Sequence, residues 1–136
     1  MYLSHLYLYL FLAVIVTMIT STERWGNQGG YYVADFRDNN METSAWFTPG
    51  GSLHLVEYDI FYSALPQAVK TDIASSEYAA WKIDDVDMLI KNGKEIVYVI
   101  EVESGKQEVD LYYSAEGILI KTIVNGKGNH VPQITP

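Results

Sequence analysis

The sequence predicts an α+β protein in which tandem helix-plus-antiparallel-meander repeats form a sheet with helix on one face. Two observations carry most of this prediction. Residues 32–57 align without a gap on residues 98–123, and in each copy polar and apolar residues alternate with the period of a β-strand. The third observation is a helix-like apolar stripe between the copies, formed by Leu65, Val69 and Ile73 at a spacing of four residues.

Each copy is predicted to contain three antiparallel strands. They fall near residues 31–37, 43–47 and 52–57 in the first copy and near residues 97–103, 109–113 and 118–123 in the second. Strict alternation places Tyr32, Ala34 and Phe36 on one face of the first strand. The copies share a glycine before the third strand, Gly51 or Gly117, and a glycine there suits a turn with a positive φ angle.

The helix between the copies has recognisable ends. Pro66 suits a first helical position, Ser63 is a candidate cap ahead of it, and Ser75 and Ser76 close the helix. No comparable helix precedes Trp25 in the first copy, because an uncharged head stands in that place. The first repeat is therefore predicted to lack its usual helix.

The head contains no Asp, Glu, Lys or Arg before Glu23, and between Leu6 and Ile19 only Thr17 interrupts the apolar run. A helix through this segment has no polar face. Its length and the small residues near Ser21 favour a signal peptide, although a basic start is missing. A membrane anchor is the second reading, because residues 2–19 would span about 27 Å as a helix. A buried core helix or a misassigned start is the third.

These observations divide the chain into four segments. Residues 1–22 are predicted to be an apolar signal peptide or membrane anchor, and residues 125–136 a flexible tail rich in glycine and proline. Residues 23–60 are predicted to form a partial first repeat, and residues 61–124 a complete second one. Either export reading places the repeats in the periplasm or outside the cell, or on a membrane anchor facing the periplasm.

Composition excludes several classes of function. The 136 residues contain no cysteine, which removes disulfides, thiol nucleophiles and cysteine-ligated zinc sites. The net charge of −8 argues against nucleic acid as a partner, because phosphate binding needs clustered Lys and Arg. No phosphate-binding loop or nucleophile elbow occurs, so we expect no cofactor and no catalytic residues.

The acidic and histidine residues give only weak signals. Asp84, Asp85 and Asp87 lack the glycine and the spacing of a calcium loop, so we expect solvated charges and no metal site. The three histidines are scattered over the head, a strand and the tail. Carboxylates recur in both copies, as in Asp35 and Glu101, but acid–base catalysis would require a cleft in which one pKa is raised.

Two aromatic residues are the better candidates for binding. Trp46 and Tyr112 occupy equivalent positions on the second strand of each copy, and their neighbours along the same face are polar. Large aromatic side chains on a polar sheet face are typical of protein-binding anchors. The alternative is that both side chains pack where the repeats meet or cover the sheet.

Several dispersed motifs carry a family resemblance. The resemblance covers about Trp25 to Ile123, in the segments W-x4-GYYVADF, AWFTPGG, LPQAV, YAAWKIDDVD and EVDLYYSAEGIL. In these segments the chain resembles the PepSY-like family of exported bacterial proteins, whose fold is similar to that of the β-lactamase inhibitory protein. The resemblance implies tandem α+β repeats and a periplasmic or secreted location, and it brings no catalytic residues.

The sequence therefore favours an exported, non-catalytic binding module for a protein or peptide partner, with an inhibitor-like role as one form of that function and with Trp46 and Tyr112 as candidate binding residues. A membrane-anchored structural envelope domain is the first alternative, with membrane association through the N-terminal segment. An uncharacterised hydrolase is the second. A pocket containing Asp35, Glu101 or His54 together with a strongly perturbed carboxylate would favour that enzyme.

Overall fold

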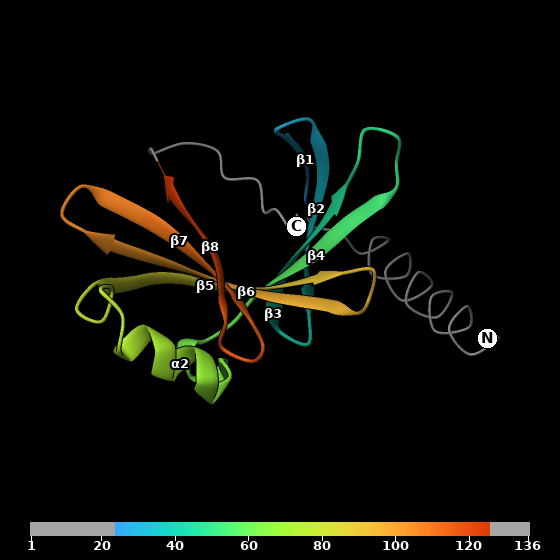
Figure 1. Ribbon diagram of the computed structural model, residues 1–136. Coiled ribbons are helices and arrows are strands. Elements are labelled where there is room, and N and C mark those ends of the chain that lie inside the picture. Colours follow the sequence, from blue (N-terminus) through green and yellow to red (C-terminus); the bar gives the residue numbers. More distant parts are fainter. Residues whose placement is uncertain (1–23, 126–136) are drawn as a thin grey trace. The chain divides into compact units, whose positions relative to one another are not determined.

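The computed structural model describes residues 24–125, which form eight strands and one α-helix (Figure 1). The elements are β1 (Arg24–Gln28), β2 (Tyr31–Asp38), β3 (Met41–Phe47), β4 (Leu53–Asp59), the 3-10 turn η1 (Tyr62–Ala64), α2 (Gln67–Ala74), β5 (Lys82–Lys91), β6 (Glu95–Ser104), β7 (Gln107–Ser114) and β8 (Leu119–Asn125). The prediction of a helix-plus-antiparallel-sheet fold is confirmed. The predicted head and tail lie outside the described residues, apart from Asn125.

The strands are hydrogen-bonded neighbours in chain order from β1 to β8. The chain divides into two compact units, one containing β1 to β4 and the other containing η1, α2 and β6 to β8. Most of β5 belongs to the second unit. Among residues 24–125, no helix is long and apolar enough to span a membrane.

In the first unit, β1 to β4 form an antiparallel meander with an apolar face. Ala34 of β2 lies opposite Ala45 of β3, and both are buried with Phe36 in a small core. Phe47 and Leu53 pack against this core. Strand β1 was missed by the sequence analysis, because Trp25 is its single large apolar residue and no alternation is visible.

The second unit buries a larger core between α2 and its strands. Leu65, Val69 and Ile73 are buried, which confirms the apolar stripe predicted for the helix. Their partners on the strands include Ile100 and Leu111, which lie opposite each other on β6 and β7. Pro66 precedes the helix as its N-cap, and no side chain, Ser63 included, caps that end.

Strands β3 and β7, the second strand of each predicted copy, share a local irregularity. The register of β3 against β4 shifts between Trp46 and Phe47, and that of β7 against β8 shifts between Tyr112 and Tyr113. The glycine that follows has a φ angle of 86° at Gly51 and 82° at Gly117. Residues with a Cβ rarely adopt this positive φ angle, which explains why both turns carry glycine.

The predicted open face around Trp46 and Tyr112 is wrong. Trp46 is only 4% exposed and Tyr112 only 1%. Along its own strand Trp46 has polar neighbours, but across the strands it lies between Val33 and Leu55, which are also buried. Cross-strand neighbours therefore determined the burial, and sequence alternation cannot show them.

Candidate functional site

The most unusual electrostatic feature is a set of carboxylates on the second unit, on the face of β6 and β7 that is opposite α2. Ile100 and Leu111 point toward the helix, so their neighbours Glu101 and Asp110 point away from it. Glu101 and Asp110 are directly opposite each other in the register of β6 and β7. We call Asp84, Asp85, Glu101, Glu108 and Asp110 the acidic face.

Glu101 is the most perturbed member of the acidic face. Partial burial and nearby negative charges together raise the pKa of its carboxyl group from an ordinary 4.5 to about 7, and burial is the largest cause. The charges that contribute, in decreasing order, are those of Glu108, Asp110, Asp84 and Asp85. Near neutral pH, Glu101 can therefore exchange a proton or gain from an approaching positive charge.

Lys82 of β5 neutralises one edge of the acidic face. Its Nζ donates hydrogen bonds to Asp84 Oδ1 at 2.8 Å and to Glu103 Oε1 at 2.6 Å. Hydrogen bonding to Asp84 and Glu103 raises the pKa of Lys82, and hydrogen bonding to Lys82 lowers the pKa of Asp84. The ammonium group of Lys82 thus pairs with Asp84 of β5 and with Glu103, which lies two residues from Glu101 on β6.

The equivalent carboxylate of the first unit is fully engaged. Asp35 accepts hydrogen bonds from Arg24 Nε at 3.0 Å and Nη2 at 2.8 Å, and from Ser44 Oγ at 2.8 Å. These three residues line a pocket with Arg37 and Glu42, which form an exposed ion pair of their own at 3.2 Å. The charged side chains that line this pocket therefore form two ion pairs, Arg24 with Asp35 and Arg37 with Glu42, which suits a role in stabilising the fold.

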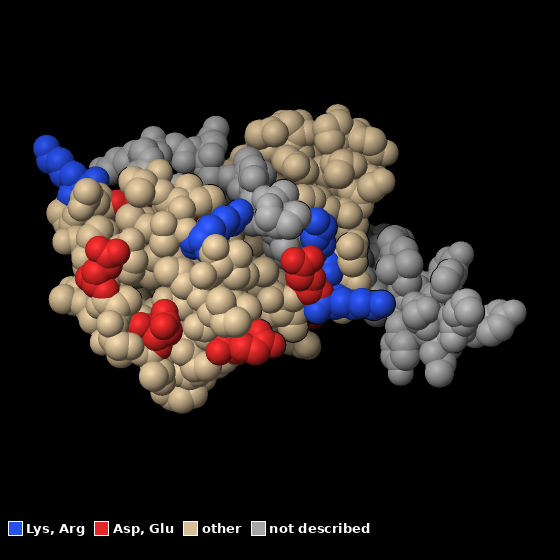
Figure 2. All heavy atoms as spheres, viewed as in Figure 1, with Lys and Arg blue, Asp and Glu red and all other residues tan. Residues whose placement is uncertain are grey.

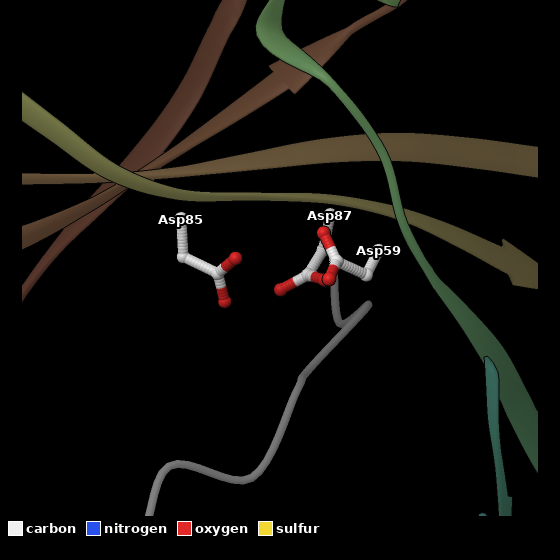
Figure 3. A group of neighbouring side chains, drawn as sticks. All are labelled: Asp59, Asp85 and Asp87. Carbon is white, nitrogen blue, oxygen red and sulfur yellow. The ribbon is translucent and has the colours of Figure 1, made fainter. Parts of the chain in front are cut away.

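Asp85 and Asp87 also approach Asp59, which the sequence analysis did not connect with them (Figure 3). One carboxylate oxygen from each residue lies within 4.8 Å of the others. Burial raises the pKa of Asp85, and the charge of Asp59 raises it further, while a hydrogen bond from the Val86 backbone N–H lowers it. With one oxygen from each residue, the group supplies three of the six to eight oxygen ligands that Ca²⁺ takes.

The other candidates are placed less informatively. His54 packs against Tyr31 with ring centroids 4.8 Å apart, and His5 and His130 lie outside the described residues. The Trp46 indole N–H is buried and has no hydrogen-bond acceptor among residues 24–125. Tyr112 lies beneath the ammonium group of Lys121, which is 4.6 Å from the ring centroid. On the face seen in Figure 2, acidic and basic side chains are both scattered among uncharged surface.

The fold and the polar faces define a class of small α+β protein in which a sheet carries a helix on one side and charged residues on the other. A family model described as "Putative beta-lactamase-inhibitor-like, PepSY-like" matches residues 30–121. The chain belongs to this family. A search of the curated proteins found no match.

Solved structures from Bacteroides agree with this membership. A β-lactamase-inhibitory-protein-like (BLIP-like) protein from Bacteroides fragilis is 33% identical, with a TM-score of 0.70, and the match covers 82% of this chain and 81% of that one. A DUF2874 family protein from Bacteroides ovatus is 26% identical, with a TM-score of 0.71, over 83% of this chain and 84% of that one. A protein from Bacteroides eggerthii described as a "putative periplasmic" protein shares the fold at 21% identity, with a TM-score of 0.72, over 83% of this chain and 85% of that one.

Proposed function

We propose that this chain is an exported, non-catalytic module that binds a protein or peptide and acts in an inhibitor-like way. The observation that carries the proposal is its membership of the β-lactamase-inhibitor-like, PepSY-like family, together with its 33% identity to a BLIP-like protein. Inhibitor-like modules act by occupying a surface of their target, so the function requires a recognition face and no catalytic group.

The acidic face is the surface best suited to that role. Burial and the like charges gathered around Glu101 together raise its pKa to about 7, so a partner that brings Lys or Arg to this face would relieve the repulsion between those charges. Trp46 and Tyr112 remain proposed binding residues as well. Because both are buried, their participation requires that a partner or a rearrangement uncover them.

We also propose that the module consists of two repeats, a partial one in residues 23–60 and a complete one in residues 61–124. The support is the matched register of β2 with β3 and of β6 with β7, in which Val33 opposite Trp46 corresponds to Val99 opposite Tyr112. The matched bulges and positive-φ glycines of the two halves support the same view.

The proposed location is the periplasm or the cell exterior. The support is the apolar head and the relative from Bacteroides eggerthii described as periplasmic. If residues 1–22 act as an anchor, the chain becomes a membrane-anchored structural envelope domain facing the periplasm. Membrane fractionation with N-terminal sequencing of the mature chain distinguishes these proposals, because cleavage near Thr22 leaves no anchor.

The function is tested by capture of partners from envelope extract, followed by binding of the identified partner in purified form. We expect Glu101→Gln combined with Glu108→Gln to weaken that binding about tenfold, or ~1.4 kcal/mol. Glu42→Gln is the matched control, because Glu42 is exposed on the first unit and should leave affinity unchanged. Trp46→Phe and Tyr112→Phe test the aromatic residues, and urea unfolding of each variant separates a loss of binding from the loss of packing at these buried sites.

Two results would contradict the proposal. Failure of any captured protein to rebind in purified form would remove the binding function, and equal affinity of the doubly neutralised variant would remove the acidic face from it. The inhibitor-like aspect is tested separately, by adding the chain to a β-lactamase and following hydrolysis of a chromogenic substrate. Unchanged hydrolysis would leave a binding module without that target.

A hydrolase is the second candidate, and one observation favours it. Glu101 has a pKa of about 7, as a general acid working near neutral pH requires, and Asp110 lies opposite it as a second carboxylate. A screen of hydrolase substrates with the natural chain and Glu101→Gln tests this candidate. Turnover that Glu101→Gln leaves unchanged would assign the activity to another group or to a contaminant.

A further inference from the structure

The two edge strands of the sheet differ in length and in charge. β1 and β8 are the first and last strands in the described order, and neither has a described strand on its outer side (Figure 1). β1 has five residues, includes Gly26, and carries Arg24, which pairs with Asp35. β8 has seven residues, and its sequence LIKTIVN contains one charged side chain. Shortness and charge usually protect a sheet edge from a further strand, so β8 is the less protected edge.

β8 also exposes apolar side chains. Val124 is 72% exposed and Ile120 49% exposed, and Ile118, just before the strand, is exposed as well. The one charged side chain, Lys121, is turned toward β7, because its Nζ lies 4.6 Å from the ring centroid of Tyr112. An apolar edge of this kind is typical of β-strand addition, in which main-chain hydrogen bonds hold an extended peptide.

The acidic face lies on one side of the β8 edge. In the register of β7 with β8, Asp110 lies opposite Ile123. Residues directly opposite each other point to the same side of a sheet, so Ile123 lies on the side of the acidic face. Val124 lies opposite Val109, which belongs to the core beneath α2, so Val124 lies on the other side. A strand added beside β8 therefore presents alternate side chains to an acidic side and to an apolar side.

We propose that the outer edge of β8 binds an extended peptide of the partner, in which basic side chains alternate with apolar ones. The inference deepens the proposed binding function and rests on it. The apolar side chains of the peptide lie beside Val124, on the α2 side of the sheet. The basic side chains lie on the side of Asp110 and Glu108, about 10 Å from β7, because neighbouring strands are about 4.7–4.9 Å apart. A long Lys or Arg side chain covers much of that distance, and Glu108 is only half-buried.

The same charges argue against a second copy of this chain as the occupant. Two β8 strands that pair antiparallel are related by a two-fold axis perpendicular to the sheet. That symmetry places the acidic faces of both copies next to each other on the same side. The carboxylates of the two copies then repel each other, and each copy has a net charge of −8. A basic strand from a partner lowers the electrostatic energy instead.

The test uses a synthetic eight-residue peptide that alternates Lys with Val, labelled with fluorescein and titrated with the full chain. In an extended strand, the Lys amides point to one edge and the Val amides to the other. Two further peptides, N-methylated at all Lys amides or at all Val amides, keep the charges and side chains but block one edge each. We expect one blocked peptide to bind about tenfold more weakly than the other. Equal affinities of the two blocked peptides would overturn the proposal, because attraction between charges does not depend on which edge is blocked.

Hydrogen exchange locates the bound peptide. At saturating peptide, the amides of residues 119–125 should exchange about tenfold more slowly, while those of residues 24–28 in β1 should be unchanged. Unchanged exchange in β8 would contradict strand addition there. Protection of β8 in a concentration-dependent dimer without the peptide would overturn the proposal in favour of a second copy.

Ile123→Lys tests the acidic side of the site. It places a positive charge opposite Asp110, so we expect it to weaken binding of the Lys–Val peptide about tenfold. Glu42→Gln is the matched control, because it changes the net charge by the same amount at an exposed residue of the first unit. Equal affinity of the two variants for the peptide would show a response to net charge alone, and the proposal would fall.

The peptide also separates this inference from the proposed function. Competition between the peptide and a purified partner would support both. A purified partner that binds with full affinity at saturating peptide would overturn strand addition and leave the binding function in place. If no captured protein rebinds while the two blocked peptides still differ, the protein-binding function falls and the peptide site remains.

Discussion

Glu101→Gln is expected to stabilise the folded chain near neutral pH. The folded state raises the pKa of Glu101 from 4.5 to about 7, so it holds this proton more tightly than the unfolded chain does. The free energy of unfolding therefore falls as the pH rises from about 4.5 to about 7, and the full cost is present above that range. Glutamine keeps the shape of the neutral side chain and cannot ionise, so it removes this cost.

The magnitude follows from the same values. At about 1.36 kcal/mol for each pH unit, the difference between 4.5 and about 7 sets an upper limit of ~3.4 kcal/mol. Glu101 is only half-buried, and solvent screens its repulsion, so we expect about 1 kcal/mol at pH 8. For a chain of this size that gain corresponds to a rise in Tm of about 3–4 °C.

Urea unfolding followed by tryptophan fluorescence at pH 5, 6, 7 and 8 measures the effect. The variant should exceed the natural chain by about 1 kcal/mol at pH 8, and the difference should shrink toward zero as the pH approaches about 4.5. Some pH dependence should remain, because the pKa of Asp85 is also raised. Glu103→Gln is the control. It removes the negative charge from the 2.6 Å contact with Lys82 and should give no stabilisation. Equal stability of the natural chain and Glu101→Gln at pH 8 would refute the reasoning.

Three further substitutions test the packing and the ion pairs by urea unfolding. Gly117→Ala places a Cβ 2.7 Å from the Ala68 backbone at a φ angle of 82°, so we expect the free energy of unfolding to fall by about 3 kcal/mol. Gly105→Ala is the control, because its Cβ meets no described atom, and it should cost about 1 kcal/mol. Similar losses for the two variants would contradict the close contact with the helix. Tyr113→Phe removes the 2.7 Å hydrogen bond to Asp72 and should cost about 2 kcal/mol, and a neutral result would mean that water replaces the hydroxyl. Arg24→Ala should cost less than about 1 kcal/mol, and the loss should disappear in 1 M NaCl, because its ion pair with Asp35 is largely exposed.

The sequence predicted the hairpins well because their signals are local. Alternation places Ala34 and Phe36 on one face, and the shared glycines mark turns that need a positive φ angle. It failed at Trp46, whose polar neighbours along β3 suggested an exposed face. The neighbours that bury Trp46 are Val33 and Leu55 on adjacent strands, and their identity depends on register.

The sequence predicted the acidic face only in part, because it shows residue types along a strand but not their neighbours on other strands. The recurrence of carboxylates at Asp35 and Glu101 is visible in the sequence repeat. Their different states depend on contacts from other strands. Asp35 accepts a hydrogen bond from Arg24 of β1, a strand that was not predicted. Glu101 of β6 instead lies opposite a second carboxylate, Asp110 of β7. Likewise, Asp59 joins Asp85 and Asp87 only after the chain has turned back along η1 and α2.

The divergence of these equivalent positions bears on where a partner binds. A carboxylate held by Arg24 and Ser44 has its hydrogen bonds filled within the fold, so substitutions there should act on stability. Glu101, by contrast, gains from any cation that approaches, because its described neighbours add negative charge. The β2–β3 hairpin thus satisfies the hydrogen bonds of Asp35 within the fold. In the β6–β7 hairpin, a positively charged partner would lower the electrostatic energy of Glu101. If binding depends on that difference, Glu108→Lys, which replaces a negative charge near Glu101 by a positive one, should stabilise the chain and weaken binding of its partner together.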